Sequence, residues 1–73
     1  MMLYRSRFNG VPIYPTIDEA GYEHIMGRGD VVVWTGRVGT YDPKEPEMYY
    51  EVYAPAQGTS GWVWFQNIEP LEG

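Results

Sequence analysis

Residues 59–71 read Thr59-Ser60-Gly61-Trp62-Val63-Trp64-Phe65-Gln66-Asn67-Ile68-Glu69-Pro70-Leu71, and the fold is best predicted from this stretch. A glycine breaks the chain direction, and the aromatic run after it is typical of a short strand. Successive side chains of a strand point to opposite faces, so an inward Val63 turns Trp62 and Trp64 outward. We therefore expect Val63 and Ile68 in the core and the two tryptophans on the other face.

Upstream of this stretch, further runs of apolar residues predict strands. Val31–Thr35 is the clearest, because β-branched and aromatic residues suit a pleated surface. Residues 48–53 form another, with Met48, Tyr50 and Val52 on one face and Tyr49, Glu51 and Tyr53 on the other. A short extended piece, Val11–Pro15, contains two prolines and suits a sheet edge. Residues 36–46 contain Gly, Asp, Lys, Glu and two prolines, which predicts a loop.

The length allows one domain with a small core, since a chain of this size buries only roughly 60% of the surface that it exposes when unfolded. No cysteine is present, so no disulfide or thiolate metal site supplements that core. Three Trp, seven Tyr and two Phe supply the missing apolar area. The expected aliphatic core consists of Ile13, Ile25, Val31, Val33, Val52, Val63 and Ile68. The aromatic surplus leaves some rings at or near the surface, drawn from Tyr14, Tyr41, Tyr49, Tyr53, Trp62 and Trp64.

Several short strands joined by Gly/Pro turns predict an all-β fold, and we expect a small five-stranded barrel over residues 10–73. A long acidic loop, Thr16–His24, separates its first two strands. Residues 1–9 are expected to form an N-terminal arm ahead of the barrel. Two aromatic side chains, Tyr4 and Phe8, would anchor that arm on a neighbour.

The charge balance disfavours nucleic acid as a partner. Ten acidic residues against five basic ones give a net charge of −5, whereas binding to phosphate backbones relies on basic patches. A basic protein surface is the more natural partner. No apolar run is long enough to span a bilayer, and the N-terminus lacks a signal-peptide core, so neither a membrane nor export is expected. The expected location is the cytoplasm or a virus particle.

No residue pattern predicts an enzyme, a cofactor or a metal site. The single histidine, His24, has no second histidine or cysteine at the spacing of a metal site, and no nucleophile motif surrounds either serine. The tripeptide Arg28-Gly29-Asp30 matches one that some adhesion receptors recognise. We interpret it instead as a tight turn in which Gly29 adopts an unusual dihedral angle and Asp30 bonds local backbone.

Three pieces of the chain, in order, resemble SH3-like barrels, and most closely the bacterial SH3 variety. They are Gly29-Asp30-Val31-Val32-Val33, Tyr49-Tyr50-Glu51-Val52 and Gly61-Trp62-Val63. Residues 66–68 then stand where that family has a short 3₁₀ turn before its closing strand. The resemblance spans roughly Pro12 to Leu71 and implies the barrel described above.

In eukaryotic SH3 domains a groove of aromatic residues and one proline receives a proline-rich peptide. The resemblance places Tyr14 and Tyr49 at two aromatic positions of that groove. Trp64 stands where the groove proline is expected, and Asn67 where a tyrosine is expected. Glu19 and Glu23 fall in the acidic loop that contacts a basic residue of the ligand.

The expected function is therefore non-enzymatic. The chain would dock a protein partner through an aromatic patch rimmed by carboxylates, as a subunit of a homo-oligomer or of a larger assembly such as a phage particle. The expected partner-binding residues are Tyr14, Glu19, Glu23, Tyr49, Trp62, Trp64 and Asn67. Two alternatives remain: a small acidic inhibitor that occludes the basic groove of a nucleic-acid enzyme, and a bacterial SH3 module that binds peptides or cell wall.

Overall fold

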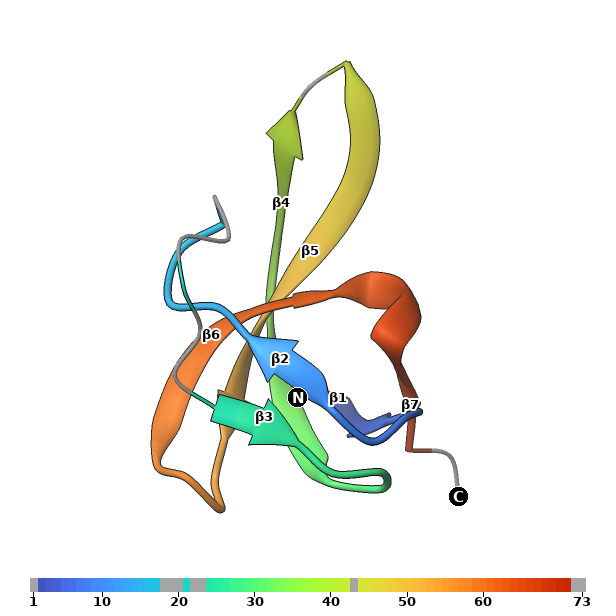
Figure 1. Ribbon diagram of the computed structural model, residues 1–73, viewed down its shortest axis with the longest axis vertical. Helices are drawn as coiled ribbons and strands as arrows, with labels where there is room; N and C mark the ends of the chain where they lie inside the picture. The colour runs from blue at the N-terminus through green and yellow to red at the C-terminus, as the bar shows by residue number, and fades with distance from the viewer. Residues whose placement is uncertain (1, 18–20, 22–23, 43, 72–73) are drawn as a thin grey trace.

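The structure is a computed structural model that describes residues 2–17, 21, 24–42 and 44–71 (Figure 1). Most of these residues lie in strands. The elements are β1 (Met2–Ser6), β2 (Val11–Ile13), β3 (His24–Met26), β4 (Val31–Asp42), β5 (Glu45–Ala54), β6 (Thr59–Trp64), the 3₁₀ turn η1 (Phe65–Asn67) and β7 (Ile68–Pro70). The all-β prediction is confirmed. No helix in the described part of the chain is long and apolar enough to cross a membrane.

The strands form two sheets rather than one closed barrel. Five of them make an antiparallel sheet in the order β6-β5-β4-β1-β7, while β2 and β3 form a separate hairpin. The hairpin reaches the larger sheet at one bridge, between Tyr14 and Trp62. The prediction of a five-stranded barrel is therefore wrong in strand count and in closure. This single bridge does not pair β6 with the hairpin along the length of the strand. The barrel is therefore not closed between β6 and the hairpin.

The N-terminal segment is part of the sheet and does not form an arm. Strand β1 lies between β4 and β7 and pairs with both, so it is an interior strand. Tyr4 and Ser6 are buried, whereas Leu3 and Arg5 on the opposite face are exposed. The alternation of apolar and basic residues in this segment is thus the pattern of a half-buried strand. Burial of Tyr4 gives β1 its place in the core.

The core draws at least one residue from each of the seven strands. Its members are Tyr4, Val11, Ile13, Met26, Val32, Val52, Ala54, Val63 and Ile68. Val63 and Ile68 are buried as expected, with exposed fractions of 0% and 5%. The assignments of Val31 and Ile25 to the core were wrong, because these side chains are 40% and 52% exposed. In a run of three valines the sequence allows either Val32 or the pair Val31 and Val33 to point inward. In the structure Val32 is the one that points inward.

A cluster of aromatic rings extends this core. The rings of Trp34 and Tyr50 stack with centroids 4.6 Å apart, and Tyr4 meets both edge-on at 6.0 and 5.8 Å. Phe65 from η1 lies 6.3 Å from Tyr50. Edge-to-face and offset-stacked pairs are the favoured arrangements of aromatic side chains. Aromatic rings thus add to the apolar contacts of this small core, as the composition suggested.

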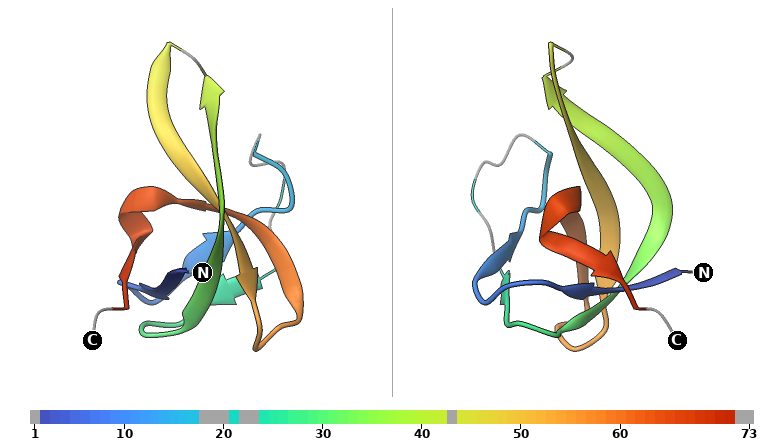
Figure 2. Two further views of the ribbon diagram at one scale, coloured as in Figure 1. Left: turned by 180° about the vertical axis from the view of Figure 1, so that it is seen from behind. Right: turned by 90° about the vertical axis from the view of Figure 1, so that its right-hand side faces the viewer.

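Strands β4 and β5 form a long hairpin that projects beyond the rest of the molecule (Figures 1 and 2). Residues 36–42 were predicted to belong to a loop but continue β4. The pairing shifts there. Val38 lies four positions after Trp34, whereas their partners on β5, Tyr50 and Val52, are only two positions apart. Gly36 has a φ of +97°, which a glycine adopts without steric cost. The sequence features that suggested a loop therefore belong to a β-bulge.

The turn before β4 has the structure predicted for Arg28-Gly29-Asp30. Gly29 has a φ of +88°, and the Asp30 carboxylate accepts a hydrogen bond from the Gly27 amide at 2.9 Å. The amide of Gly29 donates to the Ser6 carbonyl at 2.9 Å, which ties the turn to β1. Asp30 is therefore held by its own turn. The 3₁₀ turn expected before the closing strand is also present, as η1.

Candidate functional site

The outer face of β5 and β6 brings together three of the seven predicted partner-binding residues, Tyr49, Trp62 and Trp64. Tyr49 is paired with Trp64, and Glu51 is paired with Trp62. Directly opposed residues of an antiparallel pair share one face of the sheet. Val52 and Val63 occupy the alternate positions and point into the core. Trp62 and Trp64 are half-buried on the outer face, as their alternation with Val63 predicted.

A backbone bridge adds Tyr14 to this face. The Tyr14 amide donates to the Trp62 carbonyl at 2.9 Å, and the Trp62 amide donates to the Tyr14 carbonyl at 2.7 Å. This bridge fixes the end of β2 beside β6. We call Tyr14, Tyr49, Trp62 and Trp64 together the aromatic face. Residues from three separate parts of the sequence thus reach one surface through two strand pairings.

Tyr49 is the floor of the aromatic face rather than part of its surface. Its side chain is only 3% exposed, yet it does not belong to the core cluster on the other side of the sheet. It was expected at or near the surface. Its two neighbours in register, Gly39 on β4 and Trp64 on β6, place it between strands in the middle of the sheet. A central tyrosine there is buried by the side chains around it.

Gly39 leaves space for the loop after β2. A Cβ atom at this position would lie 2.5 Å from Cδ1 of Ile17 and 3.3 Å from Cζ3 of Trp62. Ile17 and Trp62 therefore pack directly over the backbone of β4. Ile17 was not predicted as a site residue, because an isolated isoleucine in a polar loop has no periodic pattern to assign it.

Charged groups border the aromatic face along β4 and β5. The Glu51 carboxylate accepts a hydrogen bond from the Thr35 hydroxyl at 3.0 Å and forms an ion pair with Arg37 at 3.5 Å. The Arg37 guanidinium lies 5.9 Å from the Trp62 ring centroid, a cation–π distance. Glu19 and Glu23, the predicted acidic rim, lie outside the described residues. Glu51 is the described carboxylate closest in register to Trp62.

Two further features of the site concern Trp64 and Asn67. The indole Nε1–H of Trp64 is buried and has no hydrogen-bond acceptor among the described residues. A buried donor without an acceptor costs about 1–3 kcal/mol. Asn67 belongs to η1, and its carbonyl accepts a hydrogen bond from the Arg7 amide at 3.0 Å. That hydrogen bond ties the Asn67 backbone to the segment after β1. This contact of Asn67 is therefore with the N-terminal part of the fold and not with the aromatic face.

Within the described ranges, no three His, Asp or Glu side chains come together in a way that could hold a metal ion. His24 lies in β3, where it is paired with Ile13. The chemistry that the aromatic face offers is therefore apolar contact, hydrogen bonding through indole N–H groups, and charge at its border.

Comparisons with protein-family models, with curated proteins and with solved structures find no significant match to this chain.

Proposed function

We propose that this chain is a non-enzymatic protein-binding module that docks a partner through the aromatic face. One observation carries the proposal. Trp62 and Trp64 are partly exposed on the outer side of the sheet, over a buried Tyr49, although the core already has its own aromatic cluster. Tryptophan and tyrosine dominate the energetic centres of protein interfaces.

The Trp64 indole supports the same proposal. A partner that supplied a backbone carbonyl or a carboxylate to Nε1 would remove the cost of its missing hydrogen bond. The Trp34 indole, by contrast, already donates to the Arg37 carbonyl at 2.9 Å. Of these two indole donors, which lie on opposite faces of the sheet, the one without an acceptor among the described residues belongs to the proposed site.

We further propose that the fold is an open relative of the SH3-like barrel. Three features support this assignment: the order of the strands, the β2–β3 hairpin that lies between β1 and β4 in the sequence, and the 3₁₀ turn that connects β6 to β7. In that reading the aromatic face corresponds to the groove that receives an extended peptide. Trp64 replaces the groove proline and Asn67 replaces a tyrosine, so a proline-rich ligand has lost two of its usual contacts. The partner segment we propose is extended, apolar and basic.

Selection from a random peptide library displayed on phage tests this function. We expect the immobilised protein to enrich peptides that combine apolar residues with Lys or Arg. The bound peptides should shift the indole N–H resonance of Trp64 in a ¹H–¹⁵N spectrum. The double variant Trp62→Ala/Trp64→Phe should lose at least about tenfold in affinity, as expected when a central aromatic contact is removed.

Phe8→Ala is the matched control, because Phe8 is an aromatic residue that is 49% exposed, lies after β1 and does not belong to the aromatic face. Its affinity should equal that of the native protein. A library that yields no specific binder contradicts the proposal. So do peptides that bind the tryptophan double variant and the native protein equally well.

A further inference from the structure

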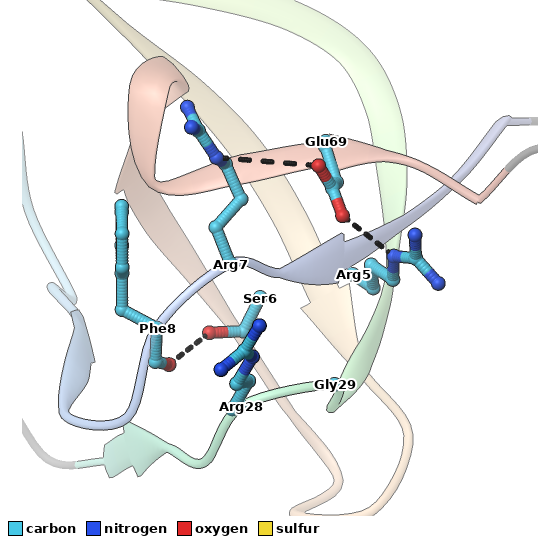
Figure 3. A pocket seen from close by; sticks show the side chains of 7 residues that line it. All are labelled: Arg5, Ser6, Arg7, Phe8, Arg28, Gly29 and Glu69. Carbon is cyan, nitrogen blue, oxygen red and sulfur yellow. Dashed lines mark hydrogen bonds and ion pairs between the residues drawn. The ribbon is translucent and has the colours of Figure 1, made fainter.

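A pocket of about 450 Å³ lies on another part of the molecule, between β1, the turn before β4, and β7 (Figure 3). Its lining residues are Arg5, Ser6, Arg7, Phe8, Arg28, Gly29 and Glu69. None of them belongs to the aromatic face. Volumes of about 300–1,000 Å³ are usual for small-molecule sites.

The pocket concentrates positive charge in an acidic protein. Three of the five basic residues of the chain line it, against the single carboxylate of Glu69. Their formal charges leave +2 at the pocket, while the remaining residues of the chain carry −7. Screening limits electrostatic attraction to about 8–10 Å at ordinary salt, so the charge closest to a bound group dominates. The composition of the whole chain hides this local excess.

Arg28 is held at the pocket by its backbone, and its side chain is not engaged. Its amide donates to Oδ1 of Asn9 at 2.9 Å, and the next amide, that of Gly29, donates to the Ser6 carbonyl. No described residue accepts a hydrogen bond from its guanidinium group, and Arg28 is one of the residues that line the pocket (Figure 3). The Ser6 hydroxyl donates to the Phe8 carbonyl at 2.7 Å and is already satisfied. An anion is the natural partner for the free guanidinium.

Arg5 and Arg7 use only part of their hydrogen-bonding capacity on Glu69. Both approach its carboxylate through Nε, at 2.7 Å for Arg5 and 4.0 Å for Arg7. The Nη1 group of Arg7 donates to the Gln66 carbonyl at 3.0 Å. The two Nη groups of Arg5 have no acceptor among the described residues. Because these side chains are about half exposed, an incoming anion competes with Glu69 at little cost.

We propose that this pocket binds a phosphomonoester dianion, carried by a small molecule or by a phosphorylated side chain. A phosphomonoester carries close to two negative charges above about pH 7, which matches the local excess of +2. Free guanidinium forks suit its oxygens bidentately. The volume exceeds what a phosphate group alone would fill, and the half-exposed Phe8 ring, on which Arg7 stacks at 5.2 Å, offers apolar contact for the attached group.

Titration with O-phosphoserine at about pH 8, followed by ¹H–¹⁵N spectra, tests this proposal. We expect saturable shifts of the Ser6, Arg28 and Gly29 amides and of the arginine Nε–H groups. Dimethyl phosphate, a monoanion, should bind at least about fivefold more weakly. A peptide that contains phosphoserine distinguishes the two sources: tighter binding than O-phosphoserine indicates a phosphoprotein, and equal binding indicates a small phosphate ester.

Variants with the same change in net charge separate a site from a general field. Arg28→Gln should weaken O-phosphoserine binding about tenfold, because one charge-assisted hydrogen-bonding group is lost. Lys44→Gln removes one positive charge at the exposed tip of the β4–β5 hairpin and should change it less than twofold. Glu69→Gln should strengthen binding, since it frees Arg5 and Arg7. Equal effects of Arg28→Gln and Lys44→Gln, shifts confined to other residues, or no saturable shift would overturn the proposal.

Discussion

The indole ring of Trp34 stacks on the phenol ring of Tyr50, with centroids 4.6 Å apart and planes inclined by 17°. The two residues are not paired across the strands: Trp34 is opposite Val52, and Tyr50 is opposite Val38. The bulge in β4 brings the two rings together. The Trp34 indole stabilises this bulge by donating a hydrogen bond to the Arg37 carbonyl at 2.9 Å. One side chain thus joins the core to the base of the projecting hairpin.

Replacing Trp34 tests this role. Trp34→Ala removes the stacked ring and the hydrogen bond to Arg37, so it should lower the free energy of unfolding by about 3 kcal/mol. Trp34→Phe retains a ring over Tyr50 and should cost about 1 kcal/mol, largely from the lost hydrogen bond. Urea unfolding followed by circular dichroism measures both. Equal losses for the two variants would show that the stacking contributes nothing.

A glycine is required at position 61 because the residues at the end of β2 lie very close to its backbone. An added Cβ would lie 2.6 Å from Cγ2 of Ile13 and 2.6 Å from the Tyr14 carbonyl oxygen. Gly61→Ala should therefore force β2 away from β6 and cost about 1–3 kcal/mol. Gly27→Ala is the matched control, because its Cβ would meet nothing closer than 3.8 Å. Thermal unfolding of both variants checks this, and a native midpoint for Gly61→Ala would contradict it.

Tyr49 should behave as a structural residue. Tyr49→Ala removes a ring that is 3% exposed and should cost about 3–5 kcal/mol of unfolding free energy. Tyr49→Phe keeps the ring and should change stability by less than about 1 kcal/mol. Urea unfolding distinguishes them. If Tyr49→Ala unfolds like the native protein, Tyr49 is not the floor of the aromatic face.

Stability should fall at alkaline pH because of Tyr4. Burial raises the pKa of its phenol above the ordinary 10.0, and the neighbouring Tyr50 raises that pKa further. Below about pH 10 the phenol is protonated in both states and contributes no pH dependence. Above it the unfolded chain releases the proton first, so the unfolding free energy falls by up to about 1.4 kcal/mol per pH unit until the folded group ionises.

Tyr4→Phe should remove this part of the decline, whereas Tyr53→Phe, at an exposed tyrosine, should leave it unchanged. Urea unfolding between about pH 9 and pH 11 compares the three proteins. A Tyr4→Phe variant that loses stability as steeply as the native protein would rule out Tyr4 as the cause.

The parts of the fold that sequence reasoning predicted are those where one strand has one dominant pattern. Alternation placed Val63 inside and Trp62 outside because the pairing of β6 with β5 is regular along its whole length. The same reasoning failed at Val31 to Val33, where three identical side chains contain no information on parity. It failed again after Thr35, since Gly36 marks a bulge and not the end of a strand.

The site was predicted in part for the same reasons. The outward positions of Trp62 and Trp64 follow from the alternation of side chains along β6. The burial of Tyr49, by contrast, depends on neighbours that only the assembled sheet supplies. The arginine pocket was missed altogether. Arg28 is more than twenty residues from Arg5 in the sequence, and the turn that joins them depends on hydrogen bonds between Gly29 and Ser6.

The interior position of β1 has a consequence for the order of folding. β1 is the first of the seven strands to leave the ribosome, whereas β7, which pairs with it, is the last. The ion pair between Arg5 and Glu69 joins residues 64 positions apart. Such distant pairings slow folding, typically to milliseconds or seconds. Until β7 has been synthesised, β1 keeps one open edge, which exposes the unfinished sheet to wrong pairing.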